Sequence, residues 1–162
     1  MEVLWGAWVK HTELGRRGQD IDVIGIYDEI WRKNKTDYPF SIDLQVIIAF
    51  QSYLSESNRE FTMTLEVVNA SGQIIYTRDE LLCMPETLDA TVQWYESYKL
   101  DGIRINEPGE YQLSILINGE VKRIVPLHVI ATKMVIYDPE KDSTTEMWPE
   151  DWKPKDDQNS QT

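Results

Sequence analysis

The chain has 162 residues, 41% of them hydrophobic and 27% charged, and its formal net charge is −12 with a pI near 4.5. A single domain of this size buries a core without the help of disulfides or a metal. The one cysteine, Cys83, cannot form a disulfide within the chain. The excess of negative charge repels phosphate groups and anionic lipids, which argues against nucleic acid or a membrane surface as the partner.

The sequence also carries no sign of export. No basic stretch leads into an apolar run of the kind that directs secretion, and no apolar segment is long enough to span a bilayer. We therefore expect a cytoplasmic protein.

The first apolar segments are of strand type. Residues 3–9 and 22–27 are rich in β-branched and aromatic side chains and are separated by a polar loop that contains glycine. Residues 41–50 alternate, and five apolar side chains share one face: Ile42, Leu44, Val46, Ile48 and Phe50. Because Ile47 and Ala49 make the opposite face apolar as well, we expect this strand to be covered on both sides.

The middle of the chain predicts a hairpin and a further strand. Residues 61–67 alternate between apolar and polar side chains, residues 69–72 supply a turn, and residues 73–77 resume a β-rich composition. Residues 79–88 are irregular and would cross between two sheets. Residues 91–98 continue the β-rich composition, although their spacing also suits a short helical turn.

Residues 108–127 predict the clearest hairpin. Pro108-Gly109 fits a type II turn, and Asn118-Gly119 is a strong signal for a two-residue hairpin loop. A longer loop or a bulge gives a more apolar register, which pairs Ile117 with Val121, Leu113 with Val125 and Tyr111 with Leu127. We therefore expect a longer loop or a bulge despite the Asn-Gly pair.

These segments amount to about eight strands joined by polar turns, with no long segment of helical period. The fold class that they predict is all-β, an antiparallel immunoglobulin-like β-sandwich over residues 1–137.

Residues 138–162 differ from this body. They carry eight acidic residues against three lysines, a net charge of −5, whereas the body has 20 acidic and 13 basic residues, a net charge of −7. This segment contains three prolines and no leucine, isoleucine or valine, so we expect a disordered acidic tail. Its two tryptophans, Trp148 and Trp152, have no local core to enter, so they either dock onto the body or anchor a partner.

Two segments resemble a family of small bacterial proteins that is classed as a domain of unknown function. Residues 23–30 (VIGIYDEI) are similar to its opening signature, and residues 105–111 (INEPGEY), continuing through Asn118-Gly119 to Val129, are similar to its closing strands. The resemblance covers about residues 1–130. It implies an immunoglobulin-like sandwich in a cytoplasmic bacterial or phage protein with no assigned activity.

Several catalytic patterns are missing from the sequence, including a phosphate-binding glycine loop, a G-x-S-x-G elbow, H-E-x-x-H and Cys-x-x-Cys. With His11 and His128 as the two histidines, a zinc site has no supporting spacing. Cys83, between Leu82 and Met84, is expected to be a small buried hydrophobic residue. We therefore expect a protein that is not an enzyme and binds no cofactor.

Two binding chemistries remain open. Asp20, Asp22 and Asp28 offer oxygen ligands for calcium, although their grouping falls short of any recognisable calcium loop. The aromatic clusters, Trp94, Tyr95 and Tyr98 in one segment and Trp5 and Trp8 in another, either fill the core or form a surface that stacks on a sugar or a peptide.

The leading hypothesis is a protein-interaction module whose acidic tail, through Trp148 and Trp152, engages a protein partner or the module's own body. The alternative is a ligand-binding sandwich of the carbohydrate or calcium-lipid type. Exposed edge strands would also allow a homodimer.

Overall fold

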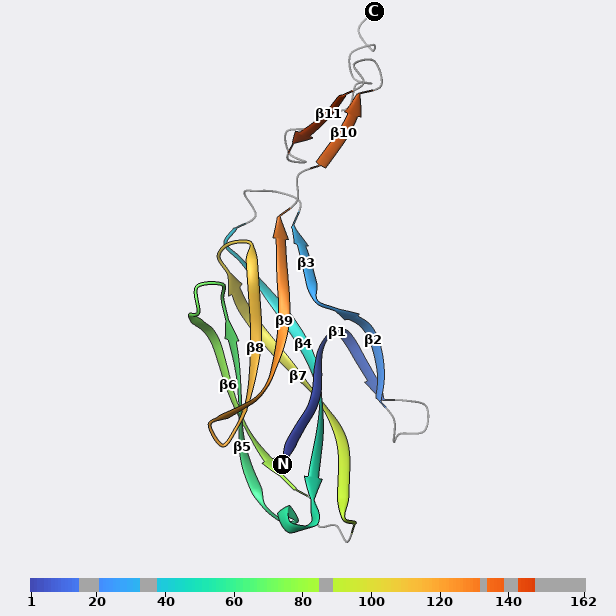
Figure 1. Ribbon diagram of the computed structural model, residues 1–162, viewed down its shortest axis with the longest axis vertical. Coiled ribbons are helices and arrows are strands. Elements are labelled where there is room, and N and C mark those ends of the chain that lie inside the picture. Colours follow the sequence, from blue (N-terminus) through green and yellow to red (C-terminus); the bar gives the residue numbers. More distant parts are fainter. Residues whose placement is uncertain (15–20, 33–37, 85–88, 132–133, 139–142, 148–162) are drawn as a thin grey trace, which may run out of the picture.

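The computed structural model describes residues 1–14, 21–32, 38–84, 89–131, 134–138 and 143–147 (Figure 1). Within these residues the chain is almost entirely β-strand, and the one helix is the short 3-10 helix η1 (Leu54–Glu56). No helix in this part of the chain has the length and apolarity needed to cross a membrane.

Two sheets form the body. The first has four strands in the order β2 (Ile21–Tyr27), β1 (Glu2–Leu14), β4 (Phe40–Tyr53) and β7 (Thr91–Ile105). The second has five strands in the order β3 (Glu29–Arg32), β9 (Glu120–Ala131), β8 (Gly109–Ile117), β5 (Glu60–Val68) and β6 (Ile74–Cys83). The predicted all-β, two-sheet architecture is confirmed.

One pair of strands departs from the expected antiparallel pattern. β3 runs parallel to β9, with Glu29 opposite His128 and Arg32 opposite Ala131. The chain leaves the first sheet at the end of β2 and, one residue later, enters the second sheet as β3. The carbonyl oxygen of Asp28, at this crossing, accepts a hydrogen bond of 2.7 Å from the backbone N–H of His128.

Strand β1 changes partners along its length. Its first part, up to Val9, pairs with β4, and its second part, from Trp8 onward, pairs with β2. At the change, the buried Trp8 donates a hydrogen bond of 2.9 Å from Nε1 to the carbonyl oxygen of Pro126 in β9. The two sheets are close here, since a Cβ atom on Gly6 would lie 3.0 Å from a methyl carbon of Val125.

The core lies between the two sheets. Four of the five expected alternating residues of β4 are buried in it, and Ile42 packs against it partly buried. With inward-facing residues of β5, β7, β8 and β9, its buried side chains include Leu44, Val46, Ile48, Phe50, Leu65, Leu100, Leu113, Ile115 and Leu127. Ile47 and Ala49, on the other face of β4, are 2% and 1% exposed, which confirms that this strand is covered on both sides.

The two predicted hairpins are present. In β5–β6 the side-chain Oδ1 of Asn69 accepts hydrogen bonds from the backbone N–H groups of Ser71 and Gln73 across the turn. In β8–β9 the loop has two residues, Asn118 and Gly119, both with positive φ.

A bulge in β8–β9 reconciles this short loop with an apolar register. Ile117 lies opposite Glu120, so the predicted Ile117–Val121 pair is wrong. The register then shifts between Ile115 and Leu116, and from there the predicted pairs of Leu113 with Val125 and Tyr111 with Leu127 are correct. The extra residue lets the Asn-Gly turn and the apolar face coexist.

A further two-stranded sheet follows the body. β10 (Met134–Asp138) pairs antiparallel with β11 (Ser143–Met147), and Met134 lies opposite Met147. The hairpin crosses the boundary that the sequence suggested at Tyr137, and residues 143–147 form a strand where a disordered segment was expected. The β-branched Thr144 and Thr145 provide strand propensity without leucine, isoleucine or valine. Residues 139–142 and 148–162 lie outside the described residues.

Candidate functional site

The outer face of the four-stranded sheet carries three exposed aromatic side chains. Trp5 of β1 and Tyr95 of β7 lie on either side of Ala49 in β4, and their ring centroids are 5.7 Å apart at a tilt of 43°. Tyr53 lies four residues farther along β4 on the same face. The exposed fractions are 37% for Trp5, 37% for Tyr53 and 48% for Tyr95. We refer to these three residues, with Gln51 and Gln93, as the aromatic surface.

Two amides occupy the row between the rings. Gln51 and Gln93 are paired across β4 and β7, and Nε2 of Gln93 donates a hydrogen bond of 2.7 Å to Oε1 of Gln51. Nε2 of Gln51 in turn donates a hydrogen bond of 3.1 Å to the hydroxyl of Tyr53. These bonds hold the amides and the Tyr53 ring in defined orientations on a surface that is otherwise open to solvent.

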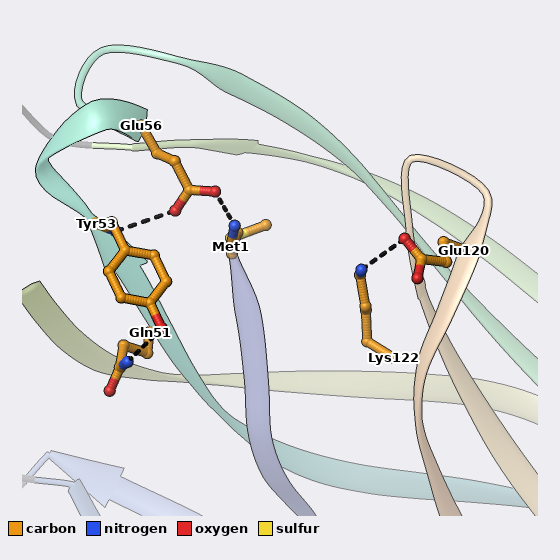
Figure 2. A network of polar contacts seen from close by, with 6 residues as sticks. All are labelled: Met1, Gln51, Tyr53, Glu56, Glu120 and Lys122. Atoms are coloured by element: carbon orange, nitrogen blue, oxygen red, sulfur yellow. Dashed lines mark hydrogen bonds and ion pairs between the residues drawn. The ribbon is translucent and has the colours of Figure 1, made fainter.

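Contacts at the end of β4 fix the backbone of Tyr53, as Figure 2 shows. The carboxylate of Glu56 accepts a hydrogen bond of 3.0 Å from the backbone N–H of Tyr53, and its other oxygen forms an ion pair with the ammonium group of Met1. The same view shows Lys122 in an ion pair of 2.6 Å with Glu120 in the β8–β9 hairpin. Tyr53 is therefore presented from a restrained strand end.

A second candidate site is the groove at which β1 leaves β4. It has a volume of about 480 Å³ and lies between the start of β4, with Ile42 and Leu44, and the β2–β3 segment, with Ile26 and Ile30. We call it the β1–β4 groove. Ile26 is 69% exposed, and the charged residues of the groove are two lysines and two acids, Lys10, Lys99, Glu29 and Asp43.

The structure separates the three aromatic residues that the sequence grouped in one segment. Residues 91–105 form a strand, so Tyr95 faces solvent while Trp94 and Tyr98 face inward. Trp94 stacks on Phe50, with centroids 5.2 Å apart, and Tyr98 is buried. Burial and a hydrogen bond to Glu96 raise the pKa of Tyr98. Of the two alternatives that the sequence left open for Tyr98, core or surface, the strand alternation gives the core.

The pair near the N-terminus divides in the same way, with Trp5 exposed and Trp8 buried. Tyr53 was not predicted. If the alternation of residues 41–50 is continued beyond Phe50, Tyr53 falls on the same face as Ile47 and Ala49 and would point outward. Its approach to Trp5 and Tyr95, however, depends on the pairing of three strands.

Of the three candidate calcium ligands, Asp28 is the one whose side chain is described. Asp20 lies outside the described residues, and the side chain of Asp22 does too, although its backbone belongs to β2. Asp28 is exposed at the crossing between the sheets. Among the described residues, no three or more His, Cys, Asp or Glu side chains form a group that could hold a metal ion. Trp148 and Trp152 also lie outside the described residues.

Two other predicted residues are now placed. Cys83 is exposed, so the prediction of a buried thiol is wrong, because Leu82 and Met84 take the inward positions on either side of it. His128 is partly exposed on β9, with Nδ1 4.0 Å from a carboxylate oxygen of Glu110.

The fold and the surface define a two-sheet β-sandwich that presents an ordered aromatic surface on one sheet. The chain belongs to a family of unknown function, DUF6941, whose model matches residues 16–130. The sequence resemblance to a family without assigned activity is thus confirmed. No curated protein matches the sequence.

Two solved structures show a distant likeness. An alkylpurine DNA glycosylase, AlkC, of Pseudomonas fluorescens is 11% identical with a TM-score of 0.40, and the match covers 64% of this chain and 28% of that one. A glycosyl hydrolase family 2 member of Bacteroides cellulosilyticus is 8% identical with a TM-score of 0.36, over 69% of this chain and 17% of the other. The chain therefore spans less than a third of either protein, and the likeness carries no functional argument.

Proposed function

We propose that the protein is a non-enzymatic protein-interaction module whose recognition surface is the aromatic surface. The observation that supports this proposal is the contact between the exposed rings of Trp5 and Tyr95 beside Tyr53 on a sheet face. Trp and Tyr are enriched among the residues that dominate binding energy, because they bury large areas at low conformational cost.

The position of the rings favours binding over a purely structural role. Scattered exposed hydrophobic side chains are ordinary in soluble proteins, whereas clustered ones indicate an interaction site. The hydrogen bonds of Gln51, Gln93 and Tyr53 restrain the surface before a partner arrives, so little side-chain entropy is lost on binding.

The test is affinity purification of the tagged full-length chain, followed by a dissociation constant for each partner with purified components. Trp5→Ala and Tyr95→Ala should each weaken binding by roughly 30-fold, which corresponds to about 2 kcal/mol, the level of a hot spot. Ile124→Ala is the matched control, because Ile124 is similarly exposed on the other sheet. Partners that bind both ring variants as tightly as the wild type would overturn the proposal.

A ligand-binding role is the second candidate, and one observation favours it. The amides of Gln51 and Gln93 lie directly beside aromatic rings, and such a combination of stacking faces and hydrogen-bonding groups suits a neutral sugar. A glycan at a concentration 100-fold above its dissociation constant should stabilise the fold by about 2.7 kcal/mol. A glycan panel followed by thermal melting distinguishes this role, and the absence of any shift would remove it.

The setting of this module is part of the same proposal. We place it in the cytoplasm of a bacterium or in a phage, with an immunoglobulin-like arrangement of its two sheets and no cofactor. The family match and the all-β architecture are consistent with this setting. Fractionation of cells that express the chain from its own gene would contradict it if the protein were found outside the cytoplasm.

A further inference from the structure

The β1–β4 groove is an opening into the hydrophobic core at one corner of the sandwich. β1 pairs with β4 only as far as Gln45, so the start of β4 has β7 on one side and the groove on the other. Leu44 at its base is fully buried, Ile30 and Ile42 are partly buried against the core, and Ile26 at its rim is largely exposed. Its volume of about 480 Å³ is within the range of sites that hold an organic ring, roughly 300–1,000 Å³.

The charged side chains around this groove differ in the partners that the described residues give them. Oε2 of Glu29 accepts a hydrogen bond of 2.8 Å from the indole of Trp31, and Oδ1 of Asp43 accepts one of 2.8 Å from the backbone N–H of Gly102. Lys99 lies 3.2 Å from Asp101. The side chain of Lys10 makes no ion pair or hydrogen bond within the described residues. Glu29 and Asp43 receive hydrogen bonds from neutral N–H groups only and keep their negative charges, so Lys10 is the one position at the groove where a carboxylate of an incoming segment finds an available cation. The apolar base of the groove suits an aromatic ring of such a segment.

The chain leaves the sandwich next to this groove. Ala131, at the end of β9, is paired with Arg32 of β3, two residues beyond the groove residue Ile30. The β10–β11 hairpin then returns the chain, because Met147 is paired with Met134. Three residues span at most about 11 Å, and paired strands lie about 5 Å apart, so residue 148 begins within roughly 20 Å of Ala131. Figure 1 shows β11 running back toward the body.

The segment that follows Met147 has the matching chemistry. Residues 148–152 read Trp-Pro-Glu-Asp-Trp, two large rings on either side of Glu150 and Asp151, and the last 25 residues contain no leucine, isoleucine or valine. Met147 is therefore the one aliphatic side chain that this segment offers to Trp148 and Trp152, whereas the groove beside the point of exit has apolar walls and the cation of Lys10.

We propose that residues 148–152 dock in the β1–β4 groove of the same chain. An indole ring fills the space between Ile26, Ile30 and Ile42, and the carboxylates of Glu150 and Asp151 face Lys10. Docking closes the corner of the sandwich and covers the exposed Ile26. The inference is independent of the proposed function, because the aromatic surface is a different set of residues.

The experiment is paramagnetic relaxation enhancement by NMR on the full-length chain. In a Cys83→Ser background, a nitroxide is attached to a cysteine introduced by Asn159→Cys. Cys83 is exposed, so its replacement leaves the core intact. The backbone amides of Gly25, Ile26 and Leu44 should lose most of their signal, whereas that of Gly72, in the β5–β6 turn, should keep it. A 1H–15N spectrum of each variant checks that the sandwich remains folded.

Three variants test the contacts that carry the inference. Combined Trp148→Ala and Trp152→Ala should restore the groove signals. Lys10→Glu should restore them in part, and adding Glu150→Lys and Asp151→Lys to Lys10→Glu should bring the broadening back, because the charges are then complementary again. Ile74→Ser, at a largely exposed position outside the groove, controls for the effect of a surface substitution and should leave the broadening unchanged.

Two results would overturn the proposal. Groove amides that keep their signals in the labelled wild-type chain, or that lose them equally in the double tryptophan variant, would show that residues 148–152 do not dock there. A mixture of 15N-labelled chains without nitroxide and unlabelled chains with it tests for exchange between molecules. Broadening in that mixture would assign the groove to a second copy instead of the same chain.

Discussion

The outer faces of the two sheets expose apolar side chains in different ways. On the four-stranded sheet, the exposed rings of Trp5 and Tyr95 contact each other above a buried layer that contains Ile47 and Ala49. On the five-stranded sheet, the exposed ring of Trp31 belongs to the edge strand β3, and the other four large exposed apolar side chains are aliphatic: Ile74, Leu81, Val121 and Ile124. Threonine and acidic residues of β5 and β6 lie among these four.

The difference shows what makes exposed apolar area informative. Both faces expose several large hydrophobic side chains, but those of the five-stranded sheet lie among polar neighbours, as on most soluble proteins. The four-stranded sheet instead combines clustered rings, directed amides and a buried layer below. Clustering and restraint of this kind are what the proposed interaction role requires of a recognition surface.

The largest expected effect tests the buried layer below the rings. Ile47→Ala should lower the free energy of unfolding by about 2–5 kcal/mol, because it leaves a cavity on a covered face. Ile124→Ala, at a 50% exposed position of the other sheet, should change it by less than about 0.5 kcal/mol. Urea unfolding measures both, and equal effects would contradict the difference between the two faces.

Sequence reasoning succeeded where one strand or one hairpin carries its own signal. The alternation in β4, the turn of β5–β6 and most of the β8–β9 register could be predicted, because period-two burial and turn chemistry are local properties. It failed for the parallel β3–β9 pair and for the aromatic surface, because both depend on pairing between strands far apart in sequence. Trp5 and Tyr95 meet only because β1 and β7 both pair with β4 at Ala49.

Composition misled in two other places. Residues 143–147 contain few strongly apolar side chains, yet threonines suffice for a strand once a partner such as β10 is next to them. Cys83 was judged by its residue type, whereas its position in the alternation of β6 decides its exposure.

The second prediction concerns Tyr98, which faces the core from β7, the strand that carries the exposed Tyr95 on its other face. Burial, with the hydrogen bond to Glu96, holds the pKa of the inward-facing Tyr98 above its usual value near 10. The folded protein keeps this proton at pH values where the unfolded chain releases it. The resulting stability is therefore complete below about pH 10 and is lost as the pH rises above it.

Above about pH 10, each such tyrosine should lower the free energy of unfolding by up to about 1.4 kcal/mol per pH unit. Tyr98→Phe should make this decrease shallower. Burial also raises the pKa of Tyr111, so Tyr111 should account for part of the decrease that remains in the variant. Urea unfolding measured between pH 8 and about pH 11 gives the slope of the unfolding free energy against pH. Ile124→Ala, which changes no titratable group, should keep the wild-type slope; a Tyr98→Phe slope equal to it would contradict the prediction.

The smallest expected effect concerns the two rings themselves. In a double-mutant cycle on unfolding free energy, Trp5→Ala and Tyr95→Ala should be coupled by about 0.5–1.5 kcal/mol, the range measured for aromatic pairs. Leu81→Ala and Ile124→Ala, on separate strands of the other sheet, should be additive to within about 0.5 kcal/mol. Additivity of the two rings would mean that their contact contributes nothing in the free protein. The aromatic surface would then be no more ordered than the aliphatic face, and its preorganisation for a partner would lose its physical basis.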